Sequence, residues 1–455
     1  MRSDWREVSV SDIAEDVAMG PFGSNIPVSC FVAAGVPVIS GRHLHESRLT
    51  EVEFNYVTVE KADELRRSNV RRGDVVFTHA GTIGQVSIVP NDSRYERYVM
   101  SQRQFKLSVQ RTEAVPEFIA YFFKSEVGQR ELFKFANQTG VPSLARPVTN
   151  LRNVRLSLPP LRDQALIAAM LASMDDRIDL LRQTNATLES IAQALFKSWF
   201  IDFDPVHAKA EGREPGGMDA ATAALFPAEF EESALGLIPK GWQARRIEEL
   251  AEKVAMGPFG SNIKVSTFVD SGVPVVSGQH LRGVLLEDRE FNFITEEHAK
   301  RLSGSLVKPG DIVLTHAGNI GQVALIPRDA AYQKYVLSQR QFYLRCNLDV
   351  ASPEHLAYFL RSSEGQHVLL ANASQVGVPS IARPASYLKS IQLVAPPVSI
   401  ARAFADVVSA VHFSISSARR RSALLQHVRD ALLPRLISGK LRLPEAQAQL
   451  EEAIA

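Results

Sequence analysis

The chain has 455 residues, 45% of them hydrophobic, which is enough for two or more folded domains. Its 51 Lys and Arg residues balance 50 Asp and Glu residues, and the net charge of +1 neither indicates nor excludes a nucleic-acid partner, because such binding depends on local patches. The two cysteines lack a Cys-x-x-Cys spacing, so neither a disulfide framework nor a structural zinc site is expected. Without a run of about 18 apolar residues or a signal segment, the sequence predicts a cytoplasmic protein with no membrane partner.

An internal repeat with an offset of 237 residues organises the chain. The segment MGPFGSNIPVSCFVAAGVPVISGRHL at 19–44 matches MGPFGSNIKVSTFVDSGVPVVSGQHL at 256–281 in 20 of 26 positions. Trp5 and Trp242 keep the same offset, so no insertion or deletion is needed along the first domain. Because solenoid repeats have periods of about 20–50 residues, this longer offset indicates a duplicated domain.

The two copies, at 1–160 and 239–397, are each expected to form a mixed α/β domain. Short β-branched segments bounded by Gly or Pro, such as GVPVISG and GDVVFTHAG, are typical of strands joined by tight turns. Between them, EKADELRRSN and PEFIAYFFKSEVGQREL have the apolar spacing of helices with a polar face. The fold class predicted is α+β, with the two domains alternating with two long helices.

The long helices are predicted at 161–201 and 398–438. In the first, apolar residues alternate in steps of three and four for over four heptads, as in a coiled coil. The second has a weaker seam, interrupted by Arg429, and Pro434 is expected to end or kink it a turn early. A helix packed in a domain core is the alternative, although about 40 residues would extend roughly 60 Å.

Two segments lie outside the domains and long helices. Residues 202–238 are rich in Ala, Gly, Pro and acidic residues, which is typical of a linker with at most one short helix. Residues 439–455 are expected to form a C-terminal tail.

Four phrases carry a resemblance to a known family. They are LPPLRDQALIA at 158–168, ALFKSWFIDFDP at 194–205, LFPAEFEESALGLIPKGW at 225–242 and LLPRLISGKLRL at 432–443. Together with the alternation of domain and long helix, they make nearly the whole chain resemble the specificity (S) subunit of type I restriction-modification systems.

The resemblance implies two target-recognition domains, each reading one half of a bipartite site in double-stranded DNA, and two helices that pair antiparallel as a spacer. It also implies two modification subunits that methylate adenine and restriction subunits that translocate and cut DNA. S-adenosylmethionine, ATP and Mg²⁺ would then be bound by these partners, and this chain would hold no cofactor, metal or catalytic residue. The outer helix faces, KSWFIDF and SGKLRL are candidate docking surfaces, although Trp199 and Phe200 fit a core position equally well.

The repeated Ser-Gln-Arg-Gln supplies side chains that read base edges, since Arg pairs with guanine and Gln with adenine in the major groove. If YVMSQRQF is a strand, the two glutamines point to one face and the arginine to the other, so only one set can face DNA. A polar strand face with Arg103 in an internal ion pair is the alternative. The candidates are Gln102, Arg103, Gln104, Gln339, Arg340 and Gln341.

Three further repeated features are candidate DNA contacts. The GPFGSN loops allow close backbone approach at their glycines, the THAGTIGQ and THAGNIGQ turns expose a histidine, and the arginines that end GVPSLAR and GVPSIAR can neutralise phosphates. Each has a plain alternative, namely a structural turn, a structural histidine and an ordinary surface arginine. The candidates are Ser24, Asn25, His79, Arg146, Ser261, Asn262, His316 and Arg383.

Because the two domains are so alike, they are predicted to read a near-palindromic target with an interrupted centre. Arg42 and Gln279 differ between the copies and are expected to carry any difference in what each copy reads, and the divergent stretches 45–69 and 282–306 could also break the symmetry.

Two rival functions belong to other classes. A self-contained restriction-methylation enzyme would need further motifs, yet no GxxxxGK[ST], HExxH or Asn-Pro-Pro-Tyr type motif occurs. A scaffold with two β-rich modules on a coiled-coil rod, binding no DNA, is the second rival, and it would show no steep dependence on salt.

Overall fold

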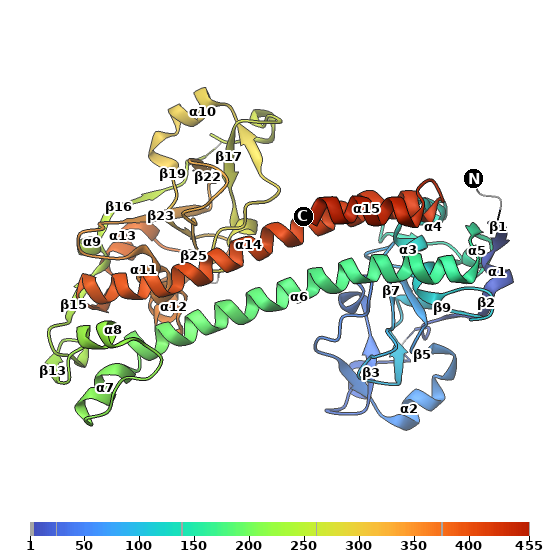
Figure 1. Cartoon of the computed structure of the whole chain (residues 1–455), viewed down its shortest axis with the longest axis horizontal. Coiled ribbons are helices and arrows are strands. Elements are labelled where there is room, and N and C mark those ends of the chain that lie inside the picture. Colours follow the sequence, from blue (N-terminus) through green and yellow to red (C-terminus); the bar gives the residue numbers. More distant parts are fainter. Residues whose placement is uncertain (1–3, 24, 138–139, 261, 375, 455) are drawn as a thin grey trace. The chain divides into compact units, whose positions relative to one another are not determined.

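The computed structural model describes residues 4–23, 25–137, 140–260, 262–374 and 376–454 (Figure 1). It divides into two compact units: unit 1 comprises Met1–Leu181 and Arg421–Ala455, and unit 2 comprises Arg182–Arg420. Both divisions fall within the long helices. Each unit therefore holds one α/β domain together with part of each helix.

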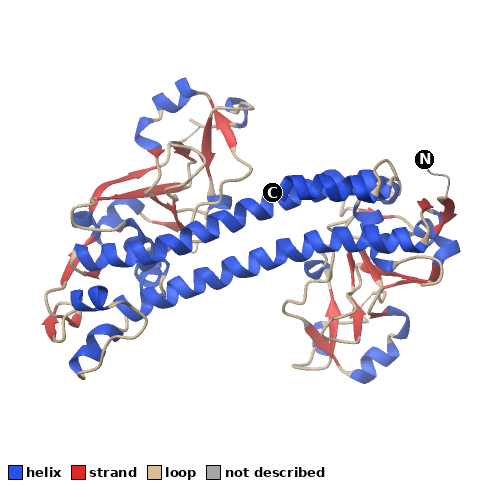
Figure 2. Cartoon of the chain, viewed as in Figure 1, coloured by secondary structure: helices blue, strands red, loops and turns tan. Residues whose placement is uncertain are grey.

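Unit 1 contains two four-stranded sheets, with strand orders β4-β3-β8-β5 and β2-β9-β6-β7 (Figure 2). Within them all neighbouring strands are antiparallel except β3 and β8. The pair β1–β12 joins the start of the domain to its end, and β10 pairs with β11. The strands are β1 (Arg6–Ser9), β2 (Ala14–Met19), β3 (Val36–Ile39), β4 (Asn55–Val57), β5 (Asn69–Arg71), β6 (Val75–Thr78), β7 (Val86–Ile88), β8 (Arg97–Met100), β9 (Gln104–Val109), β10 (Ala136–Asn137), β11 (Ser143–Leu144) and β12 (Arg155–Leu158).

Strand β6 shows why short β-branched segments form the core strands of this domain. Its four residues are all buried, and alternate side chains point to opposite faces. On one face Phe77 stacks on Phe105 at 4.9 Å between ring centroids and meets Phe123 edge-on at 5.1 Å. On the other, Val76 joins a cluster with Ile39, Leu44, Tyr98 and Met100. Each fully buried side chain of this size contributes about 1.5–3 kcal/mol.

Helix α4 (Glu126–Phe133) of unit 1 begins at a side-chain cap. Ser125 separates α3 from α4 and accepts a hydrogen bond from the Gly128 N–H at 3.3 Å. Gly128 is required there because a Cβ atom would lie 2.1 Å from the Phe122 carbonyl oxygen. The helices are α1 (Val10–Ile13), α2 (Val59–Glu64), α3 (Pro116–Lys124), α4 (Glu126–Phe133), α5 (Pro147–Asn153), the start of α6 (Leu161–Phe200), the end of α14 (Val398–Ile437), and α15 (Leu443–Ile454). The C-terminal tail thus contains a helix.

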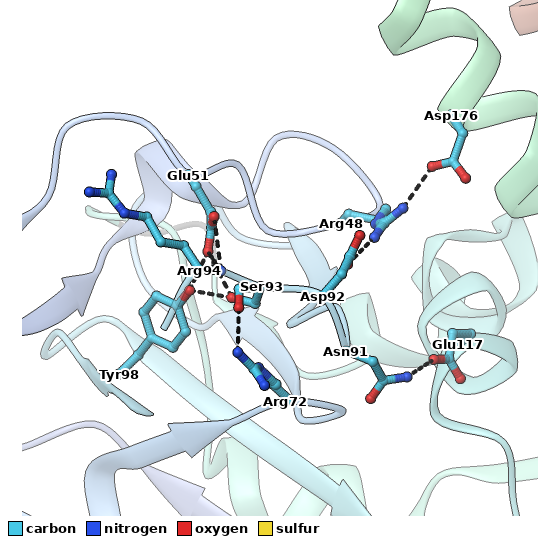
Figure 3. A network of polar contacts seen from close by, with 10 residues as sticks. All are labelled: Arg48, Glu51, Arg72, Asn91, Asp92, Ser93, Arg94, Tyr98, Glu117 and Asp176. Carbon is cyan, nitrogen blue, oxygen red and sulfur yellow. Dashed lines mark hydrogen bonds and ion pairs between the residues drawn. The ribbon is translucent and has the colours of Figure 1, made fainter. Parts of the chain in front are cut away.

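A polar network fastens the divergent stretch after residue 44 to the rest of unit 1 (Figure 3). Glu51 accepts hydrogen bonds from Ser93, at 2.7 Å, and from Tyr98. Burial and the nearby carboxylate raise the pKa of Tyr98 to about 12, so this hydroxyl stays protonated and donates. Arg48 pairs with Asp92 and, at 2.8 Å, with Asp176 of α6. The divergent stretch is therefore tied both to the sheet and to the long helix.

Unit 2 repeats this architecture with sheets β18-β17-β22-β19 and β16-β23-β20-β21. Asp288 takes the place of Glu51 and accepts from Tyr335 at 2.8 Å. The strands are β13 (Phe230–Ser233), β14 (Gly236–Pro239), β15 (Gln243–Arg246), β16 (Ala251–Met256), β17 (Val273–Val276), β18 (Asn292–Ile294), β19 (Leu306–Val307), β20 (Ile312–Thr315), β21 (Val323–Leu325), β22 (Tyr335–Leu337), β23 (Gln341–Cys346), β24 (Ala373–Ser374), β25 (Ser380–Ile381) and β26 (Gln392–Ala395). The helices are α7 (Asp204–Ala210), α8 (Ala220–Leu225), α9 (Ile247–Leu250), α10 (Glu296–Arg301), α11 (Pro353–Arg361), α12 (Ser363–Leu370) and α13 (Pro384–Ser390), with the end of α6 and the start of α14.

The segment 202–238 is more structured than the expected linker. It forms α7, α8 and the β13–β14 hairpin. Its aromatic residues pack into unit 2: Phe226 meets Trp199 edge-on at 5.3 Å, and Phe203 meets Trp242 at 5.5 Å. Trp199 and Phe200 are 2% and 4% exposed. They are core residues, so KSWFIDF does not present these two rings as a docking surface.

Helices α6 and α14 are each 40 residues long, which confirms the two predicted long helices. In unit 2, Glu189 of α6 pairs with Arg419 of α14 at 3.0 Å, and the rings of Phe196 and Phe404 are 5.8 Å apart. Residue numbers thus rise along one helix as they fall along the other, so the helices are antiparallel. The buried seam residues are Leu171, Met174, Ile178, Leu181, Ala192 and Trp199 on α6, and Val408, Ile415, Ala418, Ser422, Leu425, Leu432 and Leu436 on α14.

Pro434 does not end α14, contrary to the expectation. The helix continues to Ile437, and the Ser438 N–H bonds to the Pro434 carbonyl oxygen at 3.1 Å. A proline this close to the end removes a single backbone hydrogen bond, while Leu432 and Leu436, 2% and 0% exposed, hold the last turn in the core of unit 1.

Among the described helices, α14 alone is long and apolar enough to cross a membrane, with an 18-residue window of mean hydropathy 1.4. Its apolar residues Phe404, Val408 and Ile415 belong to the core of unit 2. Of the 18-residue window, 39% is buried within the structure.

Candidate nucleic-acid interface

Four repeated motifs that lie far apart in the sequence meet at one end of the β2-β9-β6-β7 sheet. The Gly20 N–H bonds to the Gln104 carbonyl oxygen at 2.8 Å, and the His79 N–H to that of Arg103 at 2.9 Å. The Gly81 N–H bonds to the Pro142 carbonyl oxygen at 2.9 Å. We define loop cluster 1 as the described residues of 20–25, 78–85, 101–104 and 140–146.

Unit 2 builds the same arrangement, with the Gly257–Gln341, His316–Arg340 and Gly318–Pro379 backbone bonds at 2.8, 2.9 and 2.9 Å. Loop cluster 2 comprises the described residues of 257–262, 315–322, 338–341 and 377–383. The equivalence follows from the repeat, because the same residues occupy every position that makes these bonds.

The Ser-Gln-Arg-Gln segment is a turn, so the expectation of a single strand through it is wrong. Strand β8 ends at Met100 and β9 begins at Gln104, whose N–H bonds back to the Ser101 carbonyl oxygen at 3.3 Å. Gln102 and Arg103 are both exposed at the turn, and so are Gln339 and Arg340. Gln102 and Arg103 lie between β8 and β9, which belong to different sheets, so the alternation that a strand imposes does not apply to their side chains.

Gln104 and Gln341 face inward and do not reach solvent. Each is 1% exposed. Gln104 accepts a hydrogen bond from the Ser101 hydroxyl, and its Nε2 lies 3.4 Å from the Thr78 hydroxyl; Gln341 has the same contacts with Ser338 and Thr315. The side chains of Gln104 and Gln341 therefore form hydrogen bonds within the domain beneath the turn, and they are not placed to read bases.

Gln102 and Arg103 are braced by the neighbouring loops. The Gln102 amide donates to the Gly23 carbonyl oxygen, as Gln339 does to Gly260. The Arg103 guanidinium lies against Gly81, where an added Cβ would be 3.3 Å from Nη1. The structure shows no acidic partner for Arg103 or Arg340 among the residues it describes, so the internal ion pair is not what holds these guanidinium groups.

His79 and His316 brace the same turn and are only half-exposed. Their Nε2 atoms lie 3.0 and 3.1 Å from the carbonyl oxygens of Gln102 and Gln339. Burial lowers the pKa of His316, which keeps this ring neutral, with its Nε2–H donating to the carbonyl. The geometry favours the structural role for both histidines.

The GPFGSN loops present an aromatic side chain that the sequence analysis missed. Phe22 and Phe259 are each 73% exposed. Gly23 and Gly260 follow them with φ of 62° and 63°, a backbone conformation that favours glycine. Asn25 and Asn262 are exposed, with the Asn262 amide donating to the Phe259 carbonyl oxygen at 2.6 Å. Ser24 and Ser261 lie outside the described residues. The repeated Gly-Pro-Phe-Gly motif, which places a phenylalanine in a turn, was the sequence signal for this exposed ring.

Arg146 and Arg383 adopt the left-handed conformation, with φ of 43° and 47°, directly before α5 and α13. Both are exposed. A non-glycine residue in this region costs of order 1–3 kcal/mol and is found preferentially at binding and active sites. Because the same strained backbone conformation occurs at this position in both units, Arg146 and Arg383 are candidate binding residues.

The loop clusters are free of acidic residues. None of the residues 20–25, 78–85, 101–104 and 140–146, or their counterparts in unit 2, is Asp or Glu, although the chain has 50 of them. Each cluster carries two arginines, at the turn and at the helix start. A surface with this composition suits a polyanion, because backbone amides and guanidinium groups can approach phosphates without repulsion. The described residues include no group of His, Cys, Asp and Glu placed to hold a metal ion.

Two equivalent acid-free loop clusters on duplicated α/β domains, each domain followed by a long helix, are the features of a DNA-recognition protein. Comparison with known proteins points the same way. Residues 2–190 match the type I restriction modification DNA specificity domain. Over nearly its whole length the chain is similar to specificity subunits of type I restriction-modification systems.

Similar proteins cover the chain almost end to end. The type I restriction enzyme MjaIX specificity subunit of Methanocaldococcus jannaschii is 24% identical, over 97% of this chain and 94% of the relative. The HindI specificity subunit of Haemophilus influenzae is 23% identical, over 96% of this chain and 100% of the relative. The crystal structure of a type I S subunit from M. genitalium has the same fold, with a TM-score of 0.50 and 13% identity over 95% of this chain and 96% of that one.

Proposed function

We propose that each loop cluster reads one half of a bipartite target in double-stranded DNA, and that the chain thereby directs adenine methylation or cleavage by partner subunits. The observation that carries the proposal is the pair of clusters, each acid-free and each presenting an unpaired arginine at a braced turn. The non-DNA scaffold has no need for such a surface.

Within each cluster the side chains divide by role. Gln102 and Arg103, with Gln339 and Arg340, project from the turn and are proposed to read base edges. Phosphate contacts are proposed for Asn25, Arg146 and Ser24, and for Asn262, Arg383 and Ser261, since contacts of this type fix register without carrying sequence information.

The two half-sites are proposed to be nearly the same word on opposite strands. The exposed residues of loop clusters 1 and 2 are almost identical, and the divergent stretches form equivalent elements, α2 with β4 and α10 with β18, anchored through Glu51 and Asp288. Each domain also precedes one helix of an antiparallel pair. Two recognition domains that read nearly the same word would give a near-palindromic target with an interrupted centre.

The partners are proposed to supply the chemistry: two modification subunits binding S-adenosylmethionine, and restriction subunits using ATP and Mg²⁺, in the cytoplasm. A surface for them is available on the outer faces of α6 and α14, where Leu180, Ile191 and Phe413 are 51%, 54% and 64% exposed.

The test is single-molecule mapping of N6-methyladenine in cells that carry the chain with its modification subunit, compared with cells lacking the chain. We expect one interrupted, near-palindromic motif to lose methylation when the chain is deleted. Cells carrying the Arg103→Ala, Arg340→Ala double variant should also lose it, whereas Arg213→Ala, which changes an exposed arginine outside both clusters and both divergent stretches, should leave it unchanged. Methylation that does not depend on the chain would contradict the proposal and favour the scaffold.

A further inference from the structure

Residue 82 differs from its counterpart, residue 319, in otherwise matching exposed loops. Thr82 and Asn319 are both exposed. The other described difference within the clusters, Leu144 against Ile381, is buried at 6% and 3% exposure. The exposed residues of the turn, the GPFG loop and the helix start are the same in both units.

The backbone places residue 82 beside the base-reading turn. It follows Gly81, against which the Arg103 guanidinium lies, and in unit 2 the Cβ that Gly318 lacks would be 3.1 Å from Arg340 Nη1. Gly81 and Gly84 both have φ of 86°, and the Ile83 N–H bonds to the Gly81 carbonyl oxygen at 2.9 Å, so the loop turns tightly around residue 82. Gly318 and Gly321, with φ of 86° and 83°, hold Asn319 in the same way.

The two residues expected to carry a difference, Arg42 and Gln279, are held against their own domain. The Arg42 Nε donates to His43 Nε2 at 3.3 Å, and the Gln279 amide donates to the Glu290 carbonyl oxygen at 3.2 Å. The structure therefore moves the expected point of difference from residues 42 and 279 to residues 82 and 319.

Space beside Thr82 leaves room for a partner. A hollow of about 350 Å³ lies next to it, lined in part by His45, Gln85 and Lys124. In unit 2, the counterpart of Lys124 is Arg361, which donates to the carbonyl oxygens of Gly283 and Val323 at 3.1 and 2.8 Å and so is occupied internally.

We infer that residues 82 and 319 set the one base at which the two half-sites differ, with Asn319 reading an adenine next to the base read by Arg340 and Thr82 accepting more than one base at the matching position. This inference rests on the proposed function. Asn bonds to adenine through two hydrogen bonds, whereas Thr contacts several bases without a fixed pairing.

The experiment exchanges the two side chains. In cells carrying the chain and its modification subunit, Thr82→Asn should restrict the unit 1 half-site to adenine at that position, giving two identical half-sites. Asn319→Thr should relax the unit 2 half-site by roughly 10–100-fold in preference for adenine. The readout is the methylated motif, position by position, from single-molecule sequencing.

A matched control comes from the chain itself. Arg42→Gln imports the exposed side chain that unit 2 carries at the same repeat position, and it should not alter the motif. Each substitution at 82 and 319 places a residue that the equivalent turn of the other unit already holds, so folding should be retained. Retained folding would show as a motif that is unchanged at all its other positions. Half-sites that already match at every position, or a motif unaffected by both exchanges, would overturn the inference. If no motif depends on the wild-type chain, the proposed function itself has failed.

Discussion

Three adjacent residues, Gln102, Arg103 and Gln104, have three different roles in loop cluster 1. The backbone turn exposes the first two, while the third, 1% exposed, fills the space under the turn and satisfies Ser101 and Thr78. The same division recurs at 339–341. Polar identity alone therefore does not make a side chain a reader of DNA, since burial and hydrogen bonding decide which one is available.

Gln104→Ala should lower the free energy of unfolding by about 1–3 kcal/mol, because it leaves the Ser101 hydroxyl without its acceptor and removes a donor to the buried Thr78 hydroxyl. Arg103→Ala, one residue away but exposed, should change this free energy by no more than about 0.5 kcal/mol. Its DNA affinity should instead fall by about 1–3 kcal/mol, the usual contribution of a paired arginine. Chemical denaturation and DNA titration at fixed salt separate the two. A loss of affinity with full stability in Gln104→Ala would reverse the roles assigned here.

At the scale of elements, the interruption of the α14 seam by Arg429 has a structural reason. Arg429 pairs with Asp175 of α6 at 2.5 Å, and Asp175, with its side chain 9% exposed, also accepts from Tyr121 of α3 at 2.7 Å. Burial raises the pKa of Tyr121, so its hydroxyl remains protonated and donates. This group joins both long helices to the domain of unit 1. In unit 2, Tyr358 and His412, 3.1 Å apart, occupy the positions of Tyr121 and Asp175.

Arg429→Leu should lower the free energy of unfolding by about 3–5 kcal/mol, because it leaves the buried Asp175 carboxylate without its counter-charge. Adding Asp175→Leu should restore much of that loss, since a buried ion pair is often replaceable by apolar side chains. The control is Arg420→Leu, which removes an exposed pair with Asp329 and should cost about 0–1 kcal/mol. Urea denaturation measures all three variants. Equal losses for Arg429→Leu and Arg420→Leu would show that the buried pair has no special weight.

For the whole molecule, the central feature is that two units of one chain carry equivalent loop clusters. Unit 2 is one continuous segment of the chain, whereas unit 1 combines an N-terminal segment and a C-terminal segment. Equivalent backbone hydrogen bonds nevertheless assemble both clusters. The near-neutral charge of the chain hides this, because the acidic residues lie outside the clusters. Two equal sites on one chain make a simple quantitative expectation possible.

Arg103→Ala and Arg340→Ala should each weaken binding of the target DNA by a similar free energy, and the double variant should lose the sum to within about 0.5 kcal/mol, because the two residues share no partners. The measurement is DNA affinity of the complex with its modification subunit over a range of salt concentrations. The slope of log affinity against log salt should become less steep if either arginine contacts a phosphate. A double variant no weaker than the single ones would contradict two independent reading sites.

The sequence by itself determined the duplicated domain, the two long helices, the resemblance to type I specificity subunits and the motifs of the site, because an ungapped repeat and heptad spacing can be recognised without coordinates. The tertiary structure decided which residues of those motifs are available. The segment around Gln102 has strand-like composition on both sides, so only the pairing of β8 and β9 with their neighbours revealed the turn. The packing of the segment 202–238 likewise depends on contacts such as that of Phe226 with Trp199, which no local sequence pattern specifies. The same holds for the ion pair of Arg429 with Asp175, which joins residues distant in sequence.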